Sequence, residues 1–291
     1  AHFDHLGYGE DKNTLYHDSI PMIHNGADDN ASGTAALIEL AGWVKSAGLK
    51  NYNYLFVAFS GEELGLFGSK YFTEHMPVTV GNINYMINMD MVGRLNDSSR
   101  TITVGGFGTS PSWGTLITST KMLTIKTDSS GTGPSDHTSF YRKNIPVLFF
   151  FTGSHSDYHK PTDDADKVNY SGLVLIVEYI KQLITKTDKT DKLVFAQTRE
   201  VAPARTGFKV SLGIMPDYTF AGAGIYVEGI SSGRAAEKAG ILKGDIIFKV
   251  GDISTGDMQG YMKALNSFDK GEQTTVHIKR GDKEIILPIL F

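Results

Sequence analysis

Three short, largely apolar runs constrain the fold of this 291-residue chain more than any other feature. They are YLFVAF at 54–59, INYMINM at 83–89 and IPVLFFF at 145–151. Strands that are apolar throughout are typical of a sheet covered on both faces. Longer helical patterns alternate with these runs, and they predict helices at 32–47, 111–120 and 170–185. The alternation predicts an α/β layered domain that extends to about residue 187.

The character of the sequence changes after this domain. The polar, mixed-charge stretch TKTDKTDK ends the last helical pattern and predicts a linker at 188–204. Short β-rich runs with glycine-rich turns then predict a small domain at 205–291, with helices at 234–239 and 258–265. Its expected strands are GFKVSLGI, GIYVEGI, GDIIFKV, TTVHIKR and EIILPILF.

Composition argues against several classes of protein. The 28 Lys and Arg against 32 Asp and Glu give a formal net charge of −4, so there is no basic excess to attract nucleic acid or an anionic membrane. The longest strongly apolar run, IPVLFFF, is far shorter than the ~20 residues of a membrane-spanning helix. We therefore expect neither nucleic-acid binding nor a membrane span. Because cysteine is absent, only His, Asp and Glu remain as strong metal ligands.

Acidic and histidine residues gather at the ends of the predicted strands. They are His2 and Asp4 in AHFDH, Glu62 and Glu63 in SGEELG, Asp90 in NMDMVG and His159 in SHSDYHKP, with Asp28 and Asp29 in GADDNASG before a helix. The ligand site of an open α/β sheet lies beyond the carboxyl ends of its strands. Carboxylates converging there would repel one another, and a bound dication would remove that cost.

Mixed imidazole and carboxylate ligands favour zinc, with manganese or cobalt as substitutes. The number of these side chains exceeds what one catalytic ion needs and fits two zinc ions that share a carboxylate. Asn30 or Asp29 is also expected to cap the following helix. Arg94 is expected to pair with a local acid.

The ordered motifs AHFDH, GADDNASG, SGEELGLFGS, NMDMVGR, SDHTSF and YHKPTDD resemble the co-catalytic di-zinc aminopeptidases of the bacterial leucyl aminopeptidase family, distant relatives of glutamate carboxypeptidase. The resemblance implies a mixed, mostly parallel central sheet sandwiched by helices. It implies that Asp28 bridges two zinc ions, with His2 and Asp90 completing one site and Glu63 and His159 the other. Since His2 would then stand on an internal strand, we expect this domain to be truncated at its N-terminus.

The same resemblance implies an activity, the hydrolysis of the N-terminal peptide bond through a metal-bridging hydroxide. Glu62 falls on the general base, which moves the proton of the water to the leaving amine. Asp4 falls on an acid that orients His2. Asp136 and His137 are expected to line the substrate site. The relatives are mostly exported, which implies a periplasmic or secreted location.

The C-terminal domain resembles a PDZ domain of the bacterial protease-associated type, through SLGI at 211–214 and AGILKGDII at 239–247. In that family a loop binds the terminal carboxylate of a peptide, which adds a strand to the sheet edge. Leu212, Gly213 and Ile214 occupy the loop here, so peptide C-termini or a protein partner are the expected ligands.

Two alternative functions remain open. A non-catalytic peptide-binding protein could keep a peptidase scaffold, although Glu62 is present together with all five expected ligands. A glutaminyl cyclase shares the scaffold but uses one zinc for ring closure. The number of metal ions per chain distinguishes these alternatives. The remaining unassigned histidines are expected to be solvated or locally bonded: His5, His17, His24, His75, His155 and His277.

Overall fold

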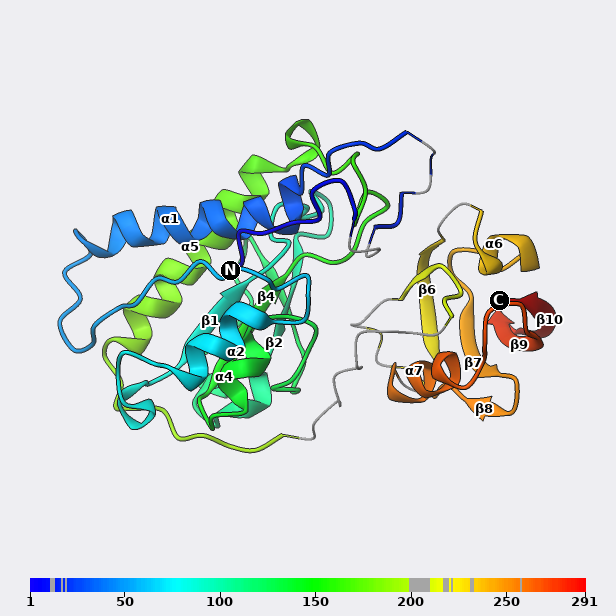
Figure 1. The fold of residues 1–291 in the computed structure, drawn as a ribbon. Helices are drawn as coiled ribbons and strands as arrows, with labels where there is room; N and C mark the ends of the chain where they lie inside the picture. Colours follow the sequence, from blue (N-terminus) through cyan, green and yellow to red (C-terminus); the bar gives the residue numbers. More distant parts are fainter. Residues whose placement is uncertain are drawn as a thin grey trace. The chain divides into compact units, whose positions relative to one another are not determined.

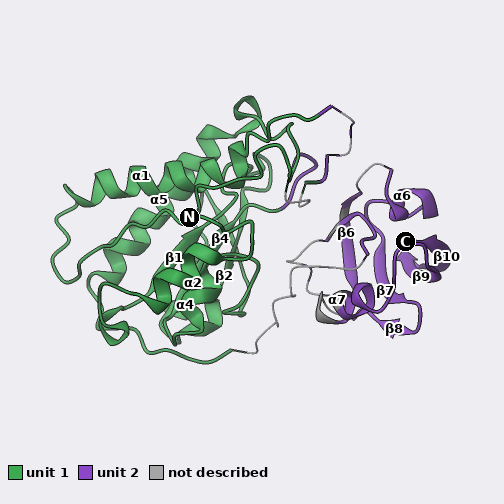
Figure 2. Cartoon of the chain, viewed as in Figure 1, with its two compact units in different colours: residues 1–14, 21–153, 159–200 green, residues 15–20, 154–158, 201–291 purple. Residues whose placement is uncertain are grey.

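The computed structural model describes residues 1–10, 14–16, 18, 20–198, 210–216, 220, 222–230, 233–256 and 258–291. The chain forms two compact units (Figure 2). The first contains residues 1–14, 21–153 and 159–200, and the second contains 15–20, 154–158 and 201–291. Residues 199–204 of the expected linker, and 205–209 of the expected second domain, lie outside the described residues.

The first unit is built on a mixed four-stranded sheet (Figure 1). Its order is β1 (Met86–Met89), β4 (Val147–Phe151), β2 (Thr101–Gly105) and β3 (Thr124–Thr127). β1 runs parallel to β4 and β2 runs parallel to β3, while β2 and β4 are antiparallel. The predicted strands at 83–89 and 145–151 are thus confirmed.

The predicted strand at 54–59 was largely wrong, because it forms a single bridge instead of a ladder. Phe59 pairs with His2 in the parallel sense. The Phe59 N–H donates to the carbonyl of Ala1 at 3.0 Å, and the Phe3 N–H donates to the carbonyl of Phe59 at 2.9 Å. Residues 54–58 carry no regular strand pairing, although Tyr54 and Phe56 pack against the core. This one bridge still fixes His2 beside the segment that leads to the two glutamates.

Helices cover both faces of this sheet. They are α1 (Gly33–Val44), α2 (Phe67–Glu74), α3 (Trp113–Leu116), α4 (His137–Tyr141) and α5 (Tyr170–Thr187). Short turns of helix occur at η1 (Ala27–Ser32), η2 (Val80–Asn82), η3 (Phe107–Thr109) and η4 (Ala165–Lys167). Successive residues of a strand point to opposite faces. Accordingly Leu148 and Phe150 of β4 join the core cluster of α1 and α5, whereas Val147 joins that of α2 and α4.

The second unit is an antiparallel β domain with two helices. Its strand order is β10 (Lys283–Leu290), β9 (Gln273–Arg280), β7 (Ile246–Val250), β6 (Ile225–Ile230) and β5 (Ile214–Pro216), and β8 (Ile253–Ser254) pairs with β7. The helices are α6 (Ala235–Ala239) and α7 (Met258–Asn266). It has its own core, in which Val227, Ile247 and Ile278 are fully buried. Among the described residues, no helix combines the length and hydropathy needed to cross a lipid bilayer.

Candidate metal centre

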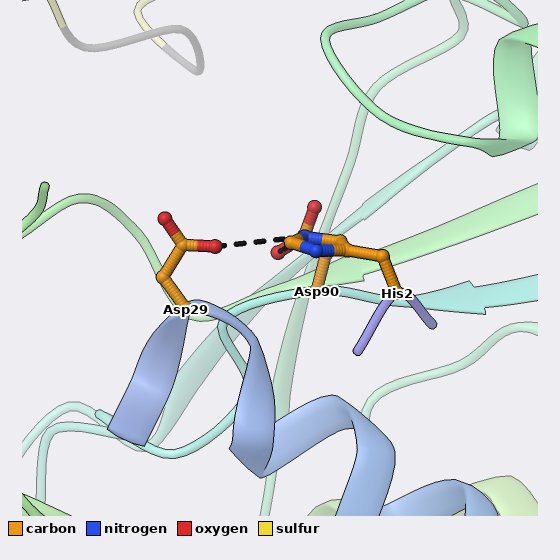
Figure 3. A group of neighbouring side chains, drawn as sticks. All are labelled: His2, Asp29 and Asp90. Carbon is orange, nitrogen blue, oxygen red and sulfur yellow. Dashed lines mark ion pairs between the residues drawn. The ribbon is translucent and has the colours of Figure 1, made fainter. Parts of the chain in front are cut away.

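Three segments that are distant in sequence bring His2, Asp29 and Asp90 together (Figure 3). His2 lies at the bridge to Phe59, Asp29 lies in η1 before α1, and Asp90 follows β1 directly. The Nε2 atom of His2 is 3.5 Å from Oδ1 of Asp29 and 3.5 Å from Oδ1 of Asp90. All three side chains are buried. A nitrogen and two carboxylate oxygens thus converge on one point.

A second convergence of donors lies on the other side of the Asp29 carboxylate. The Nε2 atom of His159 is 3.3 Å from Oδ2 of Asp29 and 3.1 Å from Oε2 of Glu63. The two oxygens of Asp29 therefore face different histidines, Oδ1 toward His2 and Oδ2 toward His159. Two sets of donors share one carboxylate, which is the arrangement expected of a pair of bridged ions.

The expected bridging residue, Asp28, does not occupy this position. Its Oδ1 atom accepts hydrogen bonds from the Ser32 hydroxyl at 2.9 Å and from the Gly93 N–H at 2.6 Å. The carboxylate of Asp28 is therefore directed at the backbone beyond β1, and Asp29 stands between the histidines instead. Asn30, one of the two residues expected to cap the following helix, accepts the N–H of Gly33 at 3.0 Å with its Oδ1, although the residue at the N-cap position of α1 is Ser32.

The donors fit a dication such as zinc. Among the described residues, Nε2 of His2 and Oδ1 of Asp90 are buried without a hydrogen-bond partner. Nδ1 of His2 lies 3.1 Å from the carbonyl oxygen of Asp4, so an N–H there leaves the lone pair of Nε2 free for a metal. Orphaned buried polar atoms are costly unless an ion satisfies them. Imidazole and carboxylate together suit zinc.

Glu62 and Asp4 lie beside the donors without belonging to either set. Oε2 of Glu62 is 3.8 Å from Nε2 of His2. The Asp4 carboxylate accepts the backbone N–H groups of Glu62 at 3.3 Å and Glu63 at 3.4 Å, and lies 3.6 Å from Nδ1 of His2. The positive φ of 67° at Gly61 provides the turn that lets both glutamates face the cluster. Asp4 therefore links the segment that carries His2 to the turn that carries Glu62 and Glu63.

Burial and mutual charge shift the pKa values of these groups strongly. Burial raises the pKa of Glu62 well above its ordinary value, and the charges of Asp90 and Glu63 add to this effect while His2 opposes it. Burial likewise raises the pKa of Asp29 to about 6. Burial acts to lower the pKa of His159, but its hydrogen bonds with Asp29 and Glu63 outweigh this and raise it to about 10. Such shifts are typical of functional sites.

The SDHTSF motif supplies a hydrogen bond to one of the metal donors. The Ser135 hydroxyl donates to Oδ2 of Asp90 at 2.6 Å, and the amide of Asn88 donates to Ser135 at 2.7 Å. Ser135 was not among the residues predicted from the sequence. Asp136 and His137 are both buried, and burial raises the pKa of Asp136 to about 6 and lowers that of His137 to about 3. Their expected contact with substrate stays a prediction.

His5 belongs to the site, so its assignment to the solvated or locally bonded histidines was wrong. Its Nδ1 atom is 2.9 Å from Oε1 of Glu63 and 4.0 Å from Oδ2 of Asp29, and it forms with them a third possible donor group. His24 is buried and lies 2.6 Å from the Thr14 hydroxyl, whereas His75 contacts the carbonyl of its own helix residue Tyr71. His17 lies outside the described residues.

Arg94 pairs with a local acid, as predicted. Its Nη2 atom donates to Oδ1 of the fully buried Asp163 at 3.0 Å. Oδ2 of Asp163 accepts the backbone N–H groups of Asp28 at 2.9 Å and Asp29 at 3.0 Å. Asp163 thus fixes the turn that presents Asp29, a role that no sequence pattern beyond the acidic TDD stretch indicates.

In the second unit, the expected carboxylate loop leads into β5, of which Ile214 is the first residue. Leu212 is fully buried and Gly213 has a positive φ of 76°. A Cβ atom at Gly213 would come within 2.2 Å of the Arg234 Cβ, so only glycine fits this position. The Gly213 N–H donates to the Ser211 hydroxyl at 3.1 Å. Carboxylate binding by Leu212, Gly213 and Ile214 therefore stays a prediction.

The fold and the paired donor sets are those of a zinc-peptidase-like domain followed by a PDZ-like domain. The family model for peptidase family M28 matches residues 1–184, and the model for the PDZ domain matches residues 187–289. The chain therefore belongs to peptidase family M28 and carries a PDZ domain after the peptidase domain.

Individual relatives match the peptidase part. Aminopeptidase YwaD of Bacillus subtilis (strain 168) is 27% identical over 191 residues, which cover 62% of this chain and 41% of that protein. Leupeptin-inactivating enzyme 1 of Streptomyces exfoliatus is 34% identical over 156 residues, 49% of this chain and 32% of that protein. The crystal structure of the zinc aminopeptidase BSAP from Bacillus subtilis superposes with a TM-score of 0.50 at 26% identity, covering 61% of this chain and 47% of that one. This chain spans less than half the length of each.

Proposed function

We propose that this chain is a zinc-dependent aminopeptidase that hydrolyses the N-terminal peptide bond of peptides, with Glu62 as general base. The observation that carries the proposal is the Asp29 carboxylate, whose two oxygens each face a different histidine. Each histidine is accompanied by a further carboxylate, Asp90 on one side and Glu63 on the other. Membership in peptidase family M28 supports the same assignment.

Two zinc ions would be held by this chain, with manganese or cobalt as substitutes. His2, Asp29 and Asp90 would hold the first, and Asp29, Glu63 and His159 would hold the second. Bound zinc supplies Lewis acidity, which polarises the scissile carbonyl and eases deprotonation of water. A free amino terminus suits this acid-lined site, because the converging carboxylates attract positive charge.

Glu62 would move the proton during hydrolysis. Its carboxylate lies next to the donor sets but belongs to neither, so it stays free to accept a proton. It would take that proton from the attacking water as the C–O bond forms, and deliver it to the leaving amine as the C–N bond breaks. Asp4 would hold Glu62 in place through its backbone N–H.

The test compares the full chain with Glu62→Gln on a panel of aminoacyl anilides with added zinc. We expect kcat to fall by about 10²–10⁴-fold, because an amide cannot accept the proton, while bound zinc is unchanged. Glu74→Gln, an exposed position on α2, is the matched control and should keep full activity. Equal activity of wild type and Glu62→Gln would refute the proposed base.

The same preparation distinguishes the alternative functions. N-acetylated peptides should resist cleavage if a free amino terminus is required. Two zinc ions per chain support the peptidase, one zinc together with pyroglutamate formation from a glutaminyl peptide supports the cyclase, and zinc-free protein without turnover supports a binding protein.

A further inference from the structure

His5 contacts the proposed metal site, although it is not one of the assigned ligands. It lies three residues after His2, yet it approaches the opposite donor set. Nδ1 of His5 is 2.9 Å from Oε1 of Glu63, whereas Nε2 of His159 is 3.1 Å from the other oxygen, Oε2. The two imidazoles thus contact different oxygens of one carboxylate.

The ring of His5 is confined by its surroundings. A Cβ atom on Gly26 would lie 2.6 Å from both Cγ and Cδ2 of His5, so the ring packs directly on a glycine backbone. The rings of His5 and His159 meet edge to face, with centroids 6.1 Å apart. The side chain of His5 is only 10% exposed. Its orientation toward Glu63 is therefore fixed by packing.

We propose that His5 is a positioning residue for the second zinc site, an inference that rests on the proposed function. Its Nδ1–H donates to Oε1 of Glu63, which leaves Oε2 directed at the ion and at His159. A carboxylate held at one oxygen cannot rotate away from the metal. Hydrogen bonds to metal ligands of this kind typically change metal affinity by about 10–100-fold.

Three substitutions at this position separate the possible roles. His5→Ala removes the donor, and we expect the second zinc to bind about 10–100-fold more weakly while the first is retained. His5→Asn places an amide N–H near the position of Nδ1 and should restore most of this affinity. His5→Gln places its amide near Nε2 instead, and should not restore it.

Zinc affinity is measured on the full chain by competition with a chromophoric chelator, which needs no turnover. The d–d spectrum of Co²⁺ in the second site gives an independent signature, and it should change in His5→Ala and return in His5→Asn. His75→Ala is the control, since His75 is exposed and bonds its own helix. Circular dichroism in chelator verifies that each variant is folded.

Two results would overturn the inference: unchanged binding of the second zinc in His5→Ala, or rescue by His5→Gln in preference to His5→Asn. The second result would mean that Nε2 acts, as a direct ligand. Failure of the proposed function looks different, because a wild-type chain that binds two zinc ions without cleaving any anilide would leave the affinity series intact.

Discussion

Asp28 and Asp29 are neighbours with the same side chain, and the fold gives them different surroundings. The first accepts hydrogen bonds from Ser32 and Gly93, and the second faces His2 and His159. A sequence of two adjacent aspartates does not reveal which one turns inward, because the direction depends on the backbone of η1. That backbone is set by Asp163, which is more than 130 residues away along the chain.

Substitution of the two aspartates by asparagine should separate these roles. Asp29→Asn replaces one of the two carboxylate oxygens with an amide nitrogen that does not ligate zinc, and it removes the negative charge between the two sites, so we expect both ions to bind at least about 10-fold more weakly. Asp28→Asn keeps an oxygen for Ser32 and Gly93 and should retain two ions. The measurement is zinc content after equilibrium dialysis at graded free zinc. If Asp28→Asn lost zinc while Asp29→Asn kept it, Asp28 and not Asp29 would be the bridging residue.

At the scale of elements, Asp163 joins three parts of the first unit. One oxygen accepts two N–H groups of η1, and the other accepts Arg94 from the segment after β1. Asp163 itself follows the segment that carries His159, and its carbonyl accepts the N–H of Ala27 at 3.0 Å. The acid therefore links the turn of the shared carboxylate to the loop of its histidine.

Replacing Asp163 should lower the free energy of unfolding measurably. Asp163→Ala leaves buried N–H groups of η1 without an acceptor, which typically costs about 1–3 kcal/mol in the free energy of unfolding. We expect the urea midpoint of the metal-free chain to fall accordingly. Asp166→Ala, an exposed position in η4, is the control and should unfold like the wild type. Equal midpoints for both variants would show that the junction does not contribute to stability.

The elements that sequence could predict are those with long or strongly apolar patterns. β1, β4, α1, α5 and most of the second unit follow from such patterns. β3 has the sequence TIKT and is mostly exposed, and α4 has only five residues, so neither carries enough periodicity to be recognised. In the site, ordered motifs singled out His2, Glu62, Glu63, Asp90 and His159, which the fold brings close together. His5 was not predicted from the sequence, because its position depends on packing against Gly26, which is a tertiary contact.

At the scale of the whole molecule, the two units have separate cores and separate expected ligands. The core clusters of the peptidase unit contain residues between 36 and 195, and that of the second unit contains residues between 210 and 291. The proposed zinc ligands all belong to the first unit. Peptide binding by the PDZ domain and a periplasmic or secreted location stay predictions.

Zinc should stabilise the first unit selectively, because only the folded site binds it. At 100-fold excess over the dissociation constant, the gain is about 2.7 kcal/mol. The two tryptophans, Trp43 and Trp113, both lie in the first unit, so their fluorescence follows its unfolding alone. We expect zinc to raise the fluorescence midpoint and a chelator to reverse this, while the far-UV transition of the second unit stays unchanged. A zinc-insensitive fluorescence midpoint would contradict the prediction.

The bridge between His2 and Phe59 lies in a segment that would connect the two proposed ion sites. The four-residue stretch from His2 to His5 begins with a proposed ligand of the first ion and ends with the side chain proposed to position Glu63 for the second ion. It is anchored to the domain through the Phe3 N–H. Release of the ions would free both ends of this stretch together. The rate of hydrogen exchange at the Phe3 amide would therefore report how fully the metal sites are occupied.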